Sequence, residues 1–432
     1  MDRREFHRRL FGAAGTLALR GLPSQAPPKV DGARISQHLA ALGEFGKNPQ
    51  GGVSRVAYTE ADRQGREAVL GWMREADLAA SIDSAGNLVG HRPGRDSSLK
   101  PLVLGSHIDS VPEGGNYDGD VGSLSAIEVA RAIAGSNTQL RHPLEVMIFQ
   151  NEEGGTIGSH AIGTGLGAAE LDRVSQSGKT IRDGIRFLGG DPDKLAAVRR
   201  ARGDIAGYLE LHIEQGGVLD EAKIPIGVVL GIVGIRHWDV TVVGFANHAG
   251  TTPMNRRHDA LLVAARCIDM VNRQVRSIPG RQVGTVGRIR VEPGAYNVIP
   301  GRVVFGLELR DLEEAKIREL FQAIRGECER ISREGGTTIG FQESLTIAPA
   351  LTDPGIRRSI AAAARSLNLK TLALPSGAGH DAQEIARIAP VGMIFIPSVG
   401  GISHSPKEFS RPQDIEHGAN VLLRTLLALD QR

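Results

Sequence analysis

The 432-residue sequence predicts an α/β fold: a large domain with a mainly parallel sheet, interrupted by a smaller inserted domain. Up to residue 231, apolar strand-like runs alternate with helical patterns, which is typical of a parallel sheet. From 232 to 347 the order changes to β-α-β-β-α-β, the ferredoxin-like arrangement. After 348 the first pattern resumes. We therefore assign residues 30–231 and 348–432 to the large domain and 232–347 to the insertion.

Within the large domain, short apolar runs predict strands, and apolar residues at helical spacing predict helices. The first part is predicted to contain strands at 101–108, 144–151 and 208–214 and helices at 123–135 and 192–202. The second part is predicted to contain helices at 353–367, 381–388 and 416–430 and strands at 369–374 and 391–396. Strands and helices that alternate in this way form a mainly parallel sheet.

The inserted domain has its own run of elements. It is predicted to contain strands at 239–243, 283–291, 303–310 and 337–346 and helices at 259–278 and 312–334. Two strand-helix-strand units in this order predict a separate small sheet.

Residues 1–26 do not fit either domain. Arg3 and Arg4 lie in a basic segment that is followed by a short, mildly apolar run from Leu10 to Leu19, and this resembles a twin-arginine export signal. The alternative is a basic N-terminal helix. Small residues suited to cleavage end at Ala26, but Pro27 would follow the cut, so the cleavage point stays open. We predict a periplasmic location, with a cytoplasmic one as the alternative.

Composition excludes several classes of partner. A net charge of +2 and an aromatic content of 4% give no reason to expect nucleic acid. No apolar run reaches the roughly 20 residues that span a bilayer, so we expect no membrane span in the mature protein. Cys267 and Cys328 fall in helical patterns, and we interpret them as packing residues rather than as a single disulfide.

Four polar clusters fall where predicted strands of the large domain end. They are His107 with Asp118, Asn151–Gly154, His212 with Glu214, and His404. Ligands of open α/β sheets gather at the carboxyl ends of the strands. Each cluster alone could be a solvated turn. Together, their His residues and carboxylates predict a site for one or two divalent metals, because imidazole suits zinc and a carboxylate can bridge two cations.

Seven motifs carry a resemblance to a known family. They are Gly105–Val111, Gly115–Gly119, Asn151–Gly154, His212–Gly216, His248–Met254, Ser376–Ala382 and Gly401–Pro406. From about residue 35 to 428 the chain resembles the metal-dependent amidase, hydantoinase and carbamoylase family, a branch of the co-catalytic metallopeptidase fold. The resemblance implies a homodimer that splits an amide or ureido C–N bond with two divalent metal ions per subunit, zinc or else manganese, cobalt or nickel.

The resemblance also implies roles for the polar clusters. Asp118 would bridge the two metals, with His107 and His212 on one side and Glu153 and His404 on the other. Glu152 would be the general base, since a carboxylate must take a proton from the attacking water and pass it to the leaving nitrogen. Asp109 would orient the imidazole of His107, the alternative being an Asp that caps a turn. Glycines around Asp118 would let the backbone approach the cations closely.

Other matching residues would contact a small-molecule substrate. Arg310 resembles a clamp for the substrate carboxylate, because a guanidinium binds a carboxylate with two parallel hydrogen bonds. His248 and Asn297 resemble polar anchors in the inserted lid domain, with His248 as a donor to the oxyanion, reaching across a dimer. Gln215 and His380 would line the pocket. Each of these residues alone could be an ordinary surface residue.

The chain departs from the family after the Glu pair. The family usually carries an Arg-Phe pair and a longer segment there, whereas this chain has only Gly155-Thr-Ile157 before Gly158. We therefore expect a reshaped wall beside the metals, which bears on the choice of substrate rather than on the type of reaction.

The sequence predicts a metal-dependent hydrolase of a linear amide that carries a free carboxylate, and specifically an N-carbamoyl-L-amino acid. The alternatives within the class are allantoate and a β-ureido acid, as for an allantoate amidohydrolase or a β-ureidopropionase. A peptidase is a weaker alternative. A non-catalytic binding protein would be favoured by loss of a ligand or of Glu152, and all of these residues are present.

Overall fold

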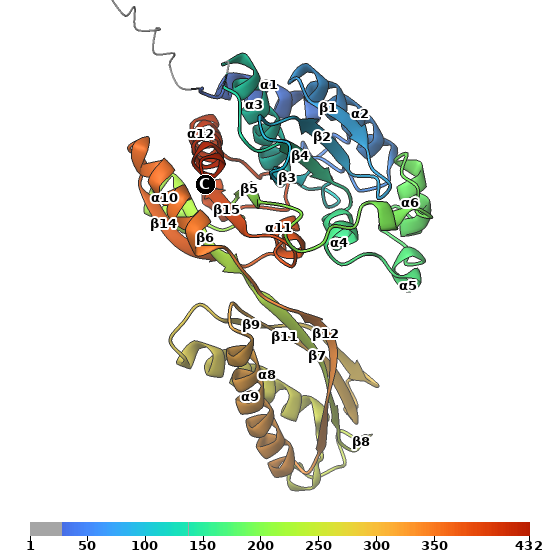
Figure 1. Ribbon diagram of the computed structural model, residues 1–432. Coiled ribbons are helices and arrows are strands. Elements are labelled where there is room, and N and C mark those ends of the chain that lie inside the picture. Colours follow the sequence, from blue (N-terminus) through green and yellow to red (C-terminus); the bar gives the residue numbers. More distant parts are fainter. Residues whose placement is uncertain (1–27, 137) are drawn as a thin grey trace, which may run out of the picture.

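The computed structural model describes residues 28–136 and 138–432, which form two units, each built around its own sheet (Figure 1). We call the nine-stranded sheet with its helices the large unit, and residues 234–347 with their four-stranded sheet the small unit. The chain passes from the first to the second directly after β6 (Ile226–Ile232) and returns after β12 (Thr338–Ile347). This arrangement confirms the predicted α/β fold class with an inserted ferredoxin-like β-α-β-β-α-β segment.

The sheet of the large unit is parallel at its centre, and most pairs toward its edges are antiparallel, whereas β14 pairs with β6 in parallel. Its strand order is β1-β2-β4-β3-β5-β15-β6-β13, with β14 paired to β6. The strands β4, β3, β5 and β15 are consecutive neighbours and mutually parallel. The other strands, besides β6, are β1 Ala79–Ile82, β2 Leu88–Arg92, β3 Leu102–His107, β4 Leu144–Phe149, β5 Gly207–Ile213, β13 Ala350–Leu351, β14 Thr371–Ser376 and β15 Val391–Ile396.

Helices cover both faces of this sheet, because its central strands are apolar on both sides. Alternate strand residues such as Leu104 and Leu211 pack against the core shared with α1, α2, α3, α10 and α12. The intervening residues, such as Phe149 and Phe395, pack toward α4 and α11. The helices are α1 Gly32–Leu42, α2 Glu60–Glu75, α3 Asp120–Gly135, α4 Ile157–Gly163, α5 Ala168–Leu171, α6 Ile181–Phe187, α7 Val218–Ala222, α10 Pro354–Ser366, α11 Asp381–Ile385 and α12 Pro412–Asp430.

The small unit is an antiparallel sheet with two helices on one face (Figure 1). Its strand order is β12-β7-β11-β9, which is the ferredoxin-like order. A two-stranded ribbon of β8 and β10 lies at the end of this unit that is far from the large unit. Besides β12, the elements are β7 Gly234–Val243, β8 Asn247–His248, α8 Ala260–Ser277, β9 Val283–Glu292, β10 Val298–Ile299, β11 Arg302–Asp311 and α9 Glu314–Glu334.

One predicted helix is wrong. Residues 192–202 contain only a single 3₁₀ turn, at Leu195–Ala197, and none of the residues of that turn is buried. A short helix is marginally stable in water unless an apolar face packs against the rest of the protein. Leu195 and Val198 are only partly buried and belong to different cores, so this segment has no such face.

The predicted export signal at 1–26 lies outside the described residues and stays a prediction. Among the residues that the structure describes, no helix combines the length and the apolar character needed to cross a membrane.

Candidate metal centre

The polar clusters predicted from the sequence meet at the carboxyl ends of the four central parallel strands. His107 is the last residue of β3, and His212 is the last but one of β5. Glu152 and Glu153 follow β4, and His404 lies in the loop after β15. Because β4, β3, β5 and β15 are neighbours in the sheet, their ends place all four clusters around one point.

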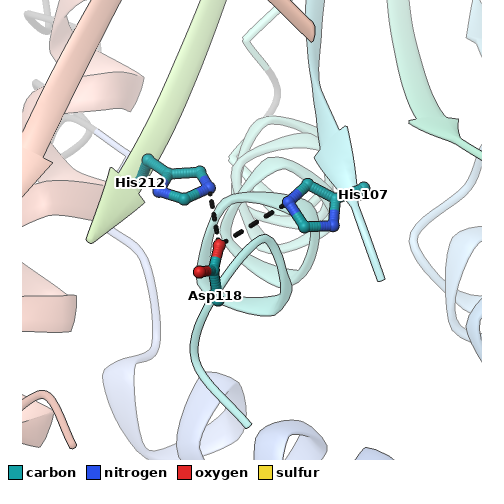
Figure 2. A group of neighbouring side chains, drawn as sticks. All are labelled: His107, Asp118 and His212. Carbon is teal, nitrogen blue, oxygen red and sulfur yellow. Dashed lines mark ion pairs between the residues drawn. The ribbon is translucent and has the colours of Figure 1, made fainter. Parts of the chain in front are cut away.

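Asp118 lies at the centre of this group, and one of its carboxylate oxygens faces both His107 and His212 (Figure 2). Its Oδ1 is 3.7 Å from Nε2 of His107 and 3.2 Å from Nε2 of His212. Its Oδ2 is 3.1 Å from Nε2 of His404, which is 3.4 Å from Oε1 of Glu153. Two groups that could hold a cation therefore share Asp118: His107–Asp118–His212 and Asp118–Glu153–His404.

The hydrogen bonds of the two buried imidazoles fit a cation between them and Asp118. Nδ1 of His107 donates to the backbone carbonyl of Asp109, and Nδ1 of His212 donates to that of Ile213, each at 3.0 Å. This assignment leaves Nε2 of both rings as an acceptor that faces a carboxylate, and Nε2 of the buried His212 has no hydrogen-bond donor. Acceptors that face one another around a carboxylate suit a divalent metal.

Electrostatics also favour a positive charge at this point. Burial would raise the pKa of Asp118, but His212, His404 and His107 outweigh it and hold that pKa well below its ordinary value. Burial opposes charge on His212, but Asp118 prevails and raises the pKa of His212 to about 9. The hydrogen bond to Asp118 raises the pKa of His404 to about 9 as well. Burial lowers the pKa of His107 to about 4, so this ring is a neutral ligand candidate.

The two adjacent Glu residues are held in a carboxylate-rich surrounding. Burial raises the pKa of Glu153 to about 8, with Asp118 adding to the effect. Burial, followed by Asp381 and Glu153, raises the pKa of Glu152 well above its ordinary range. Glu152 is on the side of His107, with Oε2 at 3.8 Å from Nε2 of that ring.

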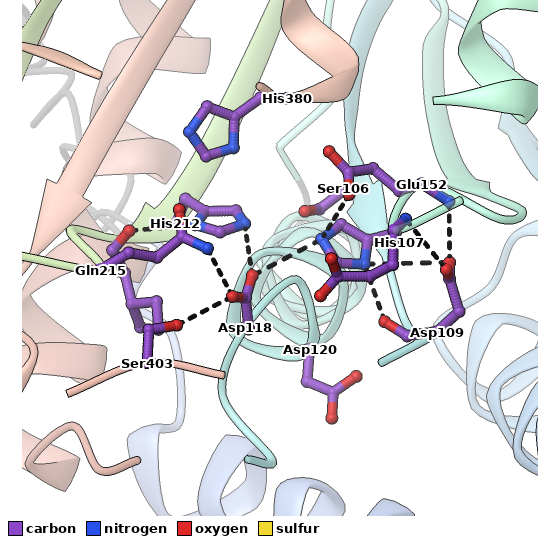
Figure 3. A network of polar contacts seen from close by, with 12 residues as sticks. Ser106, His107, Asp109, Asp118, Asp120, Glu152, His212, Gln215, His380 and Ser403 are labelled. Atoms are coloured by element: carbon purple, nitrogen blue, oxygen red, sulfur yellow. Dashed lines mark hydrogen bonds and ion pairs between the residues drawn. The ribbon is translucent and has the colours of Figure 1, made fainter. Parts of the chain in front are cut away.

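Asp109 acts on the loop of the Glu pair more directly than on the imidazole of His107 (Figure 3). Its two carboxylate oxygens accept hydrogen bonds from the backbone N–H groups of Glu152 and Glu153, each at 3.1 Å. The carboxylate lies 3.9 Å from Nδ1 of His107, whereas the backbone carbonyl of Asp109 accepts the bond from that nitrogen. Asp109 therefore joins the end of β3 to the loop after β4.

Glycine is required next to the central aspartate. A Cβ on Gly119 would lie 2.4 Å from the ring of His107, and the φ of Gly119 is +69°. Three other residues of the site, Asn151, Gln215 and His404, have φ values of +51° to +58° without being glycine. Such conformations cost energy and cluster at functional sites.

A cavity of 510 Å³ opens beside Asp118. Its lining includes Gln215, His380 and Arg310, as the sequence predicted for the pocket. Nε2 of Gln215 donates to Oδ2 of Asp118 at 2.5 Å. His380 is buried, with its ring centroid 4.5 Å from that of His212, and its Nε2 is 2.7 Å from Oγ of Ser376.

Arg310 reaches the cavity from the small unit but is already paired. Its Nε and Nη2 donate to the carboxylate of Glu308, at 2.8 and 3.1 Å. Its Nη1 donates to the carbonyl of Gly377 in the large unit, at 2.7 Å. The guanidinium therefore links the two units at the mouth of the cavity.

The structure does not bring His248 and Asn297 to this cavity. Both are exposed at the β8–β10 ribbon, where the backbone N–H of Ala249 donates to the carbonyl of Asn297 at 2.9 Å. The ribbon follows the end of β7 that pairs with Arg302, eight residues before Arg310 on β11. Eight residues of a strand span roughly 26 Å. Asn297 and Arg310 are thus at opposite ends of the small sheet.

Several lining residues were not predicted from the sequence. Where the family pattern is altered, Gly155 and Thr156 have φ values of +112° and +52°, and α4 begins directly afterwards. The wall behind this turn is charged and includes His160, Glu170, Arg173, Glu384 and Arg387. These residues lie in helices or connections without a strand-end signal, so only their proximity in the fold marks them.

Comparisons with known proteins agree with this geometry. Residues 103–428 match the peptidase family M20/M25/M40. The chain is 39% identical over 407 residues to an N-carbamoyl-L-amino acid amidohydrolase of Geobacillus stearothermophilus, covering 93% of this chain and 99% of that protein. It is 35% identical to a ureidoglycolate hydrolase of Arabidopsis thaliana, covering 93% and 87%. A solved amidase of the hydantoinase/carbamoylase family from Burkholderia multivorans superposes with a TM-score of 0.87 at 36% identity, covering 94% and 99%.

Proposed function

Because the chain belongs to peptidase family M20/M25/M40, a family of metal-dependent hydrolases, we propose that it hydrolyses the ureido C–N bond of an N-carbamoyl-L-amino acid. It is a hydrolase of C–N bonds other than peptide bonds, as are the relatives that it matches over nearly their full length. The observation that supports the proposal best is the convergence of the ligand group, Glu152 and Arg310 on one cavity.

The ligand geometry supports two divalent cations per chain. One would be held by His107, Asp118 and His212, and the other by Asp118, Glu153 and His404. Imidazole and carboxylate ligands suit zinc, with manganese, cobalt or nickel as alternatives. Cations held in this way supply Lewis acidity, which makes water a nucleophile near neutral pH and polarises a carbonyl oxygen.

Glu152 has the position of a general base. Its buried carboxylate lies beside the proposed metal ligands but is in neither ligand group. We assign to it the transfer of a proton from the attacking water to the leaving nitrogen. Burial and neighbouring carboxylates raise the pKa of Glu152, and the proposed cations would lower it again and so favour the carboxylate form that can accept this proton.

The substrate would be oriented by groups on the cavity wall. Arg310 would bind its carboxylate, exchanging part of its pairing with Glu308 for a fork of two hydrogen bonds. The amide of Gln215 and the imidazole of His380 line the same cavity and would contact the ureido group. The polar lining beside α4 is consistent with a small polar substrate.

A second copy of the chain would complete the site. His248 and Asn297 are exposed at the tip of the small unit, among exposed apolar side chains such as Phe245 (63% exposed) and Met254 (75% exposed). Nδ1 of His248 accepts from the backbone N–H groups of Gly250 and Thr251, which leaves the proton on Nε2. This tip is built to present a hydrogen-bond donor, and a homodimer would place it over the cavity of the partner.

A substrate panel tests the proposed reaction. Protein that is stripped of metal and reloaded with zinc or manganese is offered N-carbamoyl-L-amino acids, allantoate, ureidoglycolate, a β-ureido acid and dipeptides. We expect the highest kcat/KM for an N-carbamoyl-L-amino acid. A clear preference for allantoate or for a β-ureido acid would place the chain with the alternatives predicted from its sequence, and a preference for dipeptides would refute the proposal.

We also propose export by the twin-arginine pathway, on the pattern around Arg3 and Arg4. This pathway carries folded proteins, so metal acquired in the cytoplasm would be retained. Replacement of both arginines by lysine should trap the protein in the cytoplasm. Unaltered export of that variant, measured by cell fractionation, would refute the signal.

A further inference from the structure

Glu408 is a buried carboxylate that touches two of the loops carrying proposed ligands. It follows His404 by four residues and is 5% exposed. Its Oε1 accepts hydrogen bonds from the backbone N–H groups of Tyr117 and Asp118, at 2.9 and 3.0 Å. Its Oε2 accepts from the backbone N–H of His404 at 3.2 Å and from Oγ of Ser403 at 2.8 Å. All four donors belong to the two loops, and two belong to ligand residues.

These contacts join segments that are remote in the chain. Glu408 and Asp118 are separated by 290 residues. Ser403 adds a second link, because its Oγ lies 3.0 Å from Oδ2 of Asp118 as well as close to Glu408. The polar atoms of Asp118 and His404 are 3.1 Å apart, and Nε2 of Gln215 contacts both side chains. At the level of the backbone, the carboxylate of Glu408 joins the two loops directly.

The packing around Glu408 is close enough to demand a glycine. A Cβ on Gly115 would lie 2.2 Å from Oε1 of Glu408 and 2.4 Å from its Cβ. Contacts this short with a buried side chain leave no room for any other residue at 115. Glycine at 115 thus makes room for the carboxylate of Glu408 beside the loop of Asp118.

The position of His404 depends on its hydrogen bond to Glu408 more than His107 and His212 depend on any single contact. His107 and His212 are buried on strands, and each donates Nδ1–H to a backbone carbonyl. The side chain of His404 is 47% exposed, and its backbone has a φ of +53°, which a non-glycine residue adopts only at a cost. The bond from its N–H to Glu408 holds it in that conformation.

Asp109 has the same arrangement on the opposite side of the site. Its carboxylate accepts the backbone N–H groups of Glu152 and Glu153, whereas that of Glu408 accepts those of Asp118 and His404. Two carboxylates, neither of them in a ligand group, therefore tie the ligand loops together in pairs.

We propose that Glu408 is a positioning residue that sets the distance between Asp118 and His404, and so selectively retains the cation held by Asp118, Glu153 and His404. The inference rests on the proposed two-metal function. Glu408→Gln keeps the shape but replaces one acceptor oxygen by an NH₂ group. Whichever way the amide turns, a donor then faces a backbone N–H donor, and one of the two loops is released.

The test measures metal binding directly. Stripped full-length protein is equilibrated with zinc buffered by a chelator, and bound zinc per chain is determined at each free concentration. Wild type should bind two ions. In Glu408→Gln, filling the group of Asp118, Glu153 and His404 should require about 10- to 100-fold more free zinc. This is the usual cost of losing a residue that positions a metal ligand. We call the ion in this group the second ion. The cation held by His107, Asp118 and His212 should be weakened much less, because His107 and His212 are buried on strands and do not contact Glu408. Visible absorption during a cobalt titration should show the same loss of the second step.

Asp430→Asn is the matched control. Asp430 is 1% exposed, and its two oxygens accept the backbone N–H groups of Arg141 and His142, which are remote from the metal centre. This variant should lower the thermal stability of the stripped protein and leave both ions bound. Ser403→Ala removes one donor to Glu408 and should weaken binding of the same second ion by a smaller factor. If Glu408→Gln does not fold, this variant is used for the test instead.

Each outcome separates the two proposals. If wild type binds two ions and Glu408→Gln binds each of them as tightly as wild type does, the inference is wrong. It is also wrong if Glu408→Gln loses both ions in parallel with its thermal stability. If Glu408→Gln does not fold, unchanged zinc affinity in Ser403→Ala overturns the inference. If wild type itself binds fewer than two ions, the two-metal proposal fails first.

Discussion

His107 and His212 are buried at the ends of two strands of the large unit, whereas His248 is exposed at the far tip of the small unit. The buried pair is fixed through backbone carbonyls and faces a carboxylate. The exposed imidazole is also fixed, because its Nδ1 accepts from two backbone N–H groups, but its ring is open to solvent. The large unit thus assembles, within one chain, the groups that we propose for metal binding and proton transfer. The far tip of the small unit presents outward the polar groups that we propose for substrate recognition.

Because of this difference, we expect substitutions in the two regions to have different effects. Changes in the large unit should affect metal content or the chemical step of each chain by itself. Changes at the tip of the small unit should be rescued by another copy.

Removal of metal should abolish activity, because the ligand group of the large unit has no other source of Lewis acidity. Dialysis against a chelator followed by addition of zinc or manganese should restore turnover of an N-carbamoyl-amino acid. Full turnover by protein that elemental analysis shows to be free of metal would remove the basis of the proposed function.

Glu152→Gln should lower kcat by roughly 100-fold or more and keep the metal, if this carboxylate transfers the proton. His404→Ala should instead lose metal. Steady-state kinetics and metal analysis of the two variants separate chemistry from binding. If Glu152→Gln lost the metal and kept its kcat per bound metal, the roles of the two residues would be reversed.

His248→Ala should lower kcat by roughly 100-fold, the usual cost of losing an oxyanion donor. If the donor acts on the partner's cavity, mixing this variant with Glu152→Gln and letting the subunits exchange should restore activity, because each mixed dimer then contains one intact site. Activity that stays at the level of the separate variants would mean that His248 does not act across a dimer.

Arg310→Lys should raise KM for an N-carbamoyl-amino acid by roughly 10-fold, on the order of 1.4 kcal/mol, because lysine keeps the charge but loses the fork. An amidated substrate without the carboxylate should be a poor substrate for wild type and insensitive to the substitution. Equal sensitivity of both substrates would mean that Arg310 serves to hold the two units together through Gly377.

The smallest effect concerns the charged wall of the cavity. The hydrogen bond to Glu384, at 2.9 Å, raises the pKa of His160 above 6.5; Glu170 also raises it, while burial and Arg387 lower it. A raised pKa means that the stabilisation is complete below pH 6.5 and is lost as the pH rises through the higher value in the folded protein. His160→Gln should therefore reduce the unfolding free energy by about 1 kcal/mol at acidic pH and less at alkaline pH. A difference in melting temperature that does not change with pH would contradict this.

The sequence by itself predicted a mainly parallel sheet and the polar residues that meet at the carboxyl edge of that sheet. Apolar runs that end in His107, Asn151–Gly154 and His212 place these groups at strand ends, and the carboxyl ends of parallel strands share one edge. A local pattern therefore predicts a group that forms in three dimensions. The same reasoning failed at 192–202, where helical spacing exists but no neighbouring element covers an apolar face.

Tertiary structure decided which partners these groups have. The carboxylate of Asp109 accepts from the backbone of the Glu pair, and the imidazole of His107 is bound by the backbone carbonyl of Asp109 instead. Glu408 joins loops 290 residues apart. Tertiary structure also placed Asn297 and Arg310 at opposite ends of the small sheet, although Asn297 lies in the short connection that leads into the strand of Arg310. The physical reason is that spacing along the chain determines which edge or face a residue occupies. Contacts between segments remote in the chain depend on how complete units pack, and no local pattern records that.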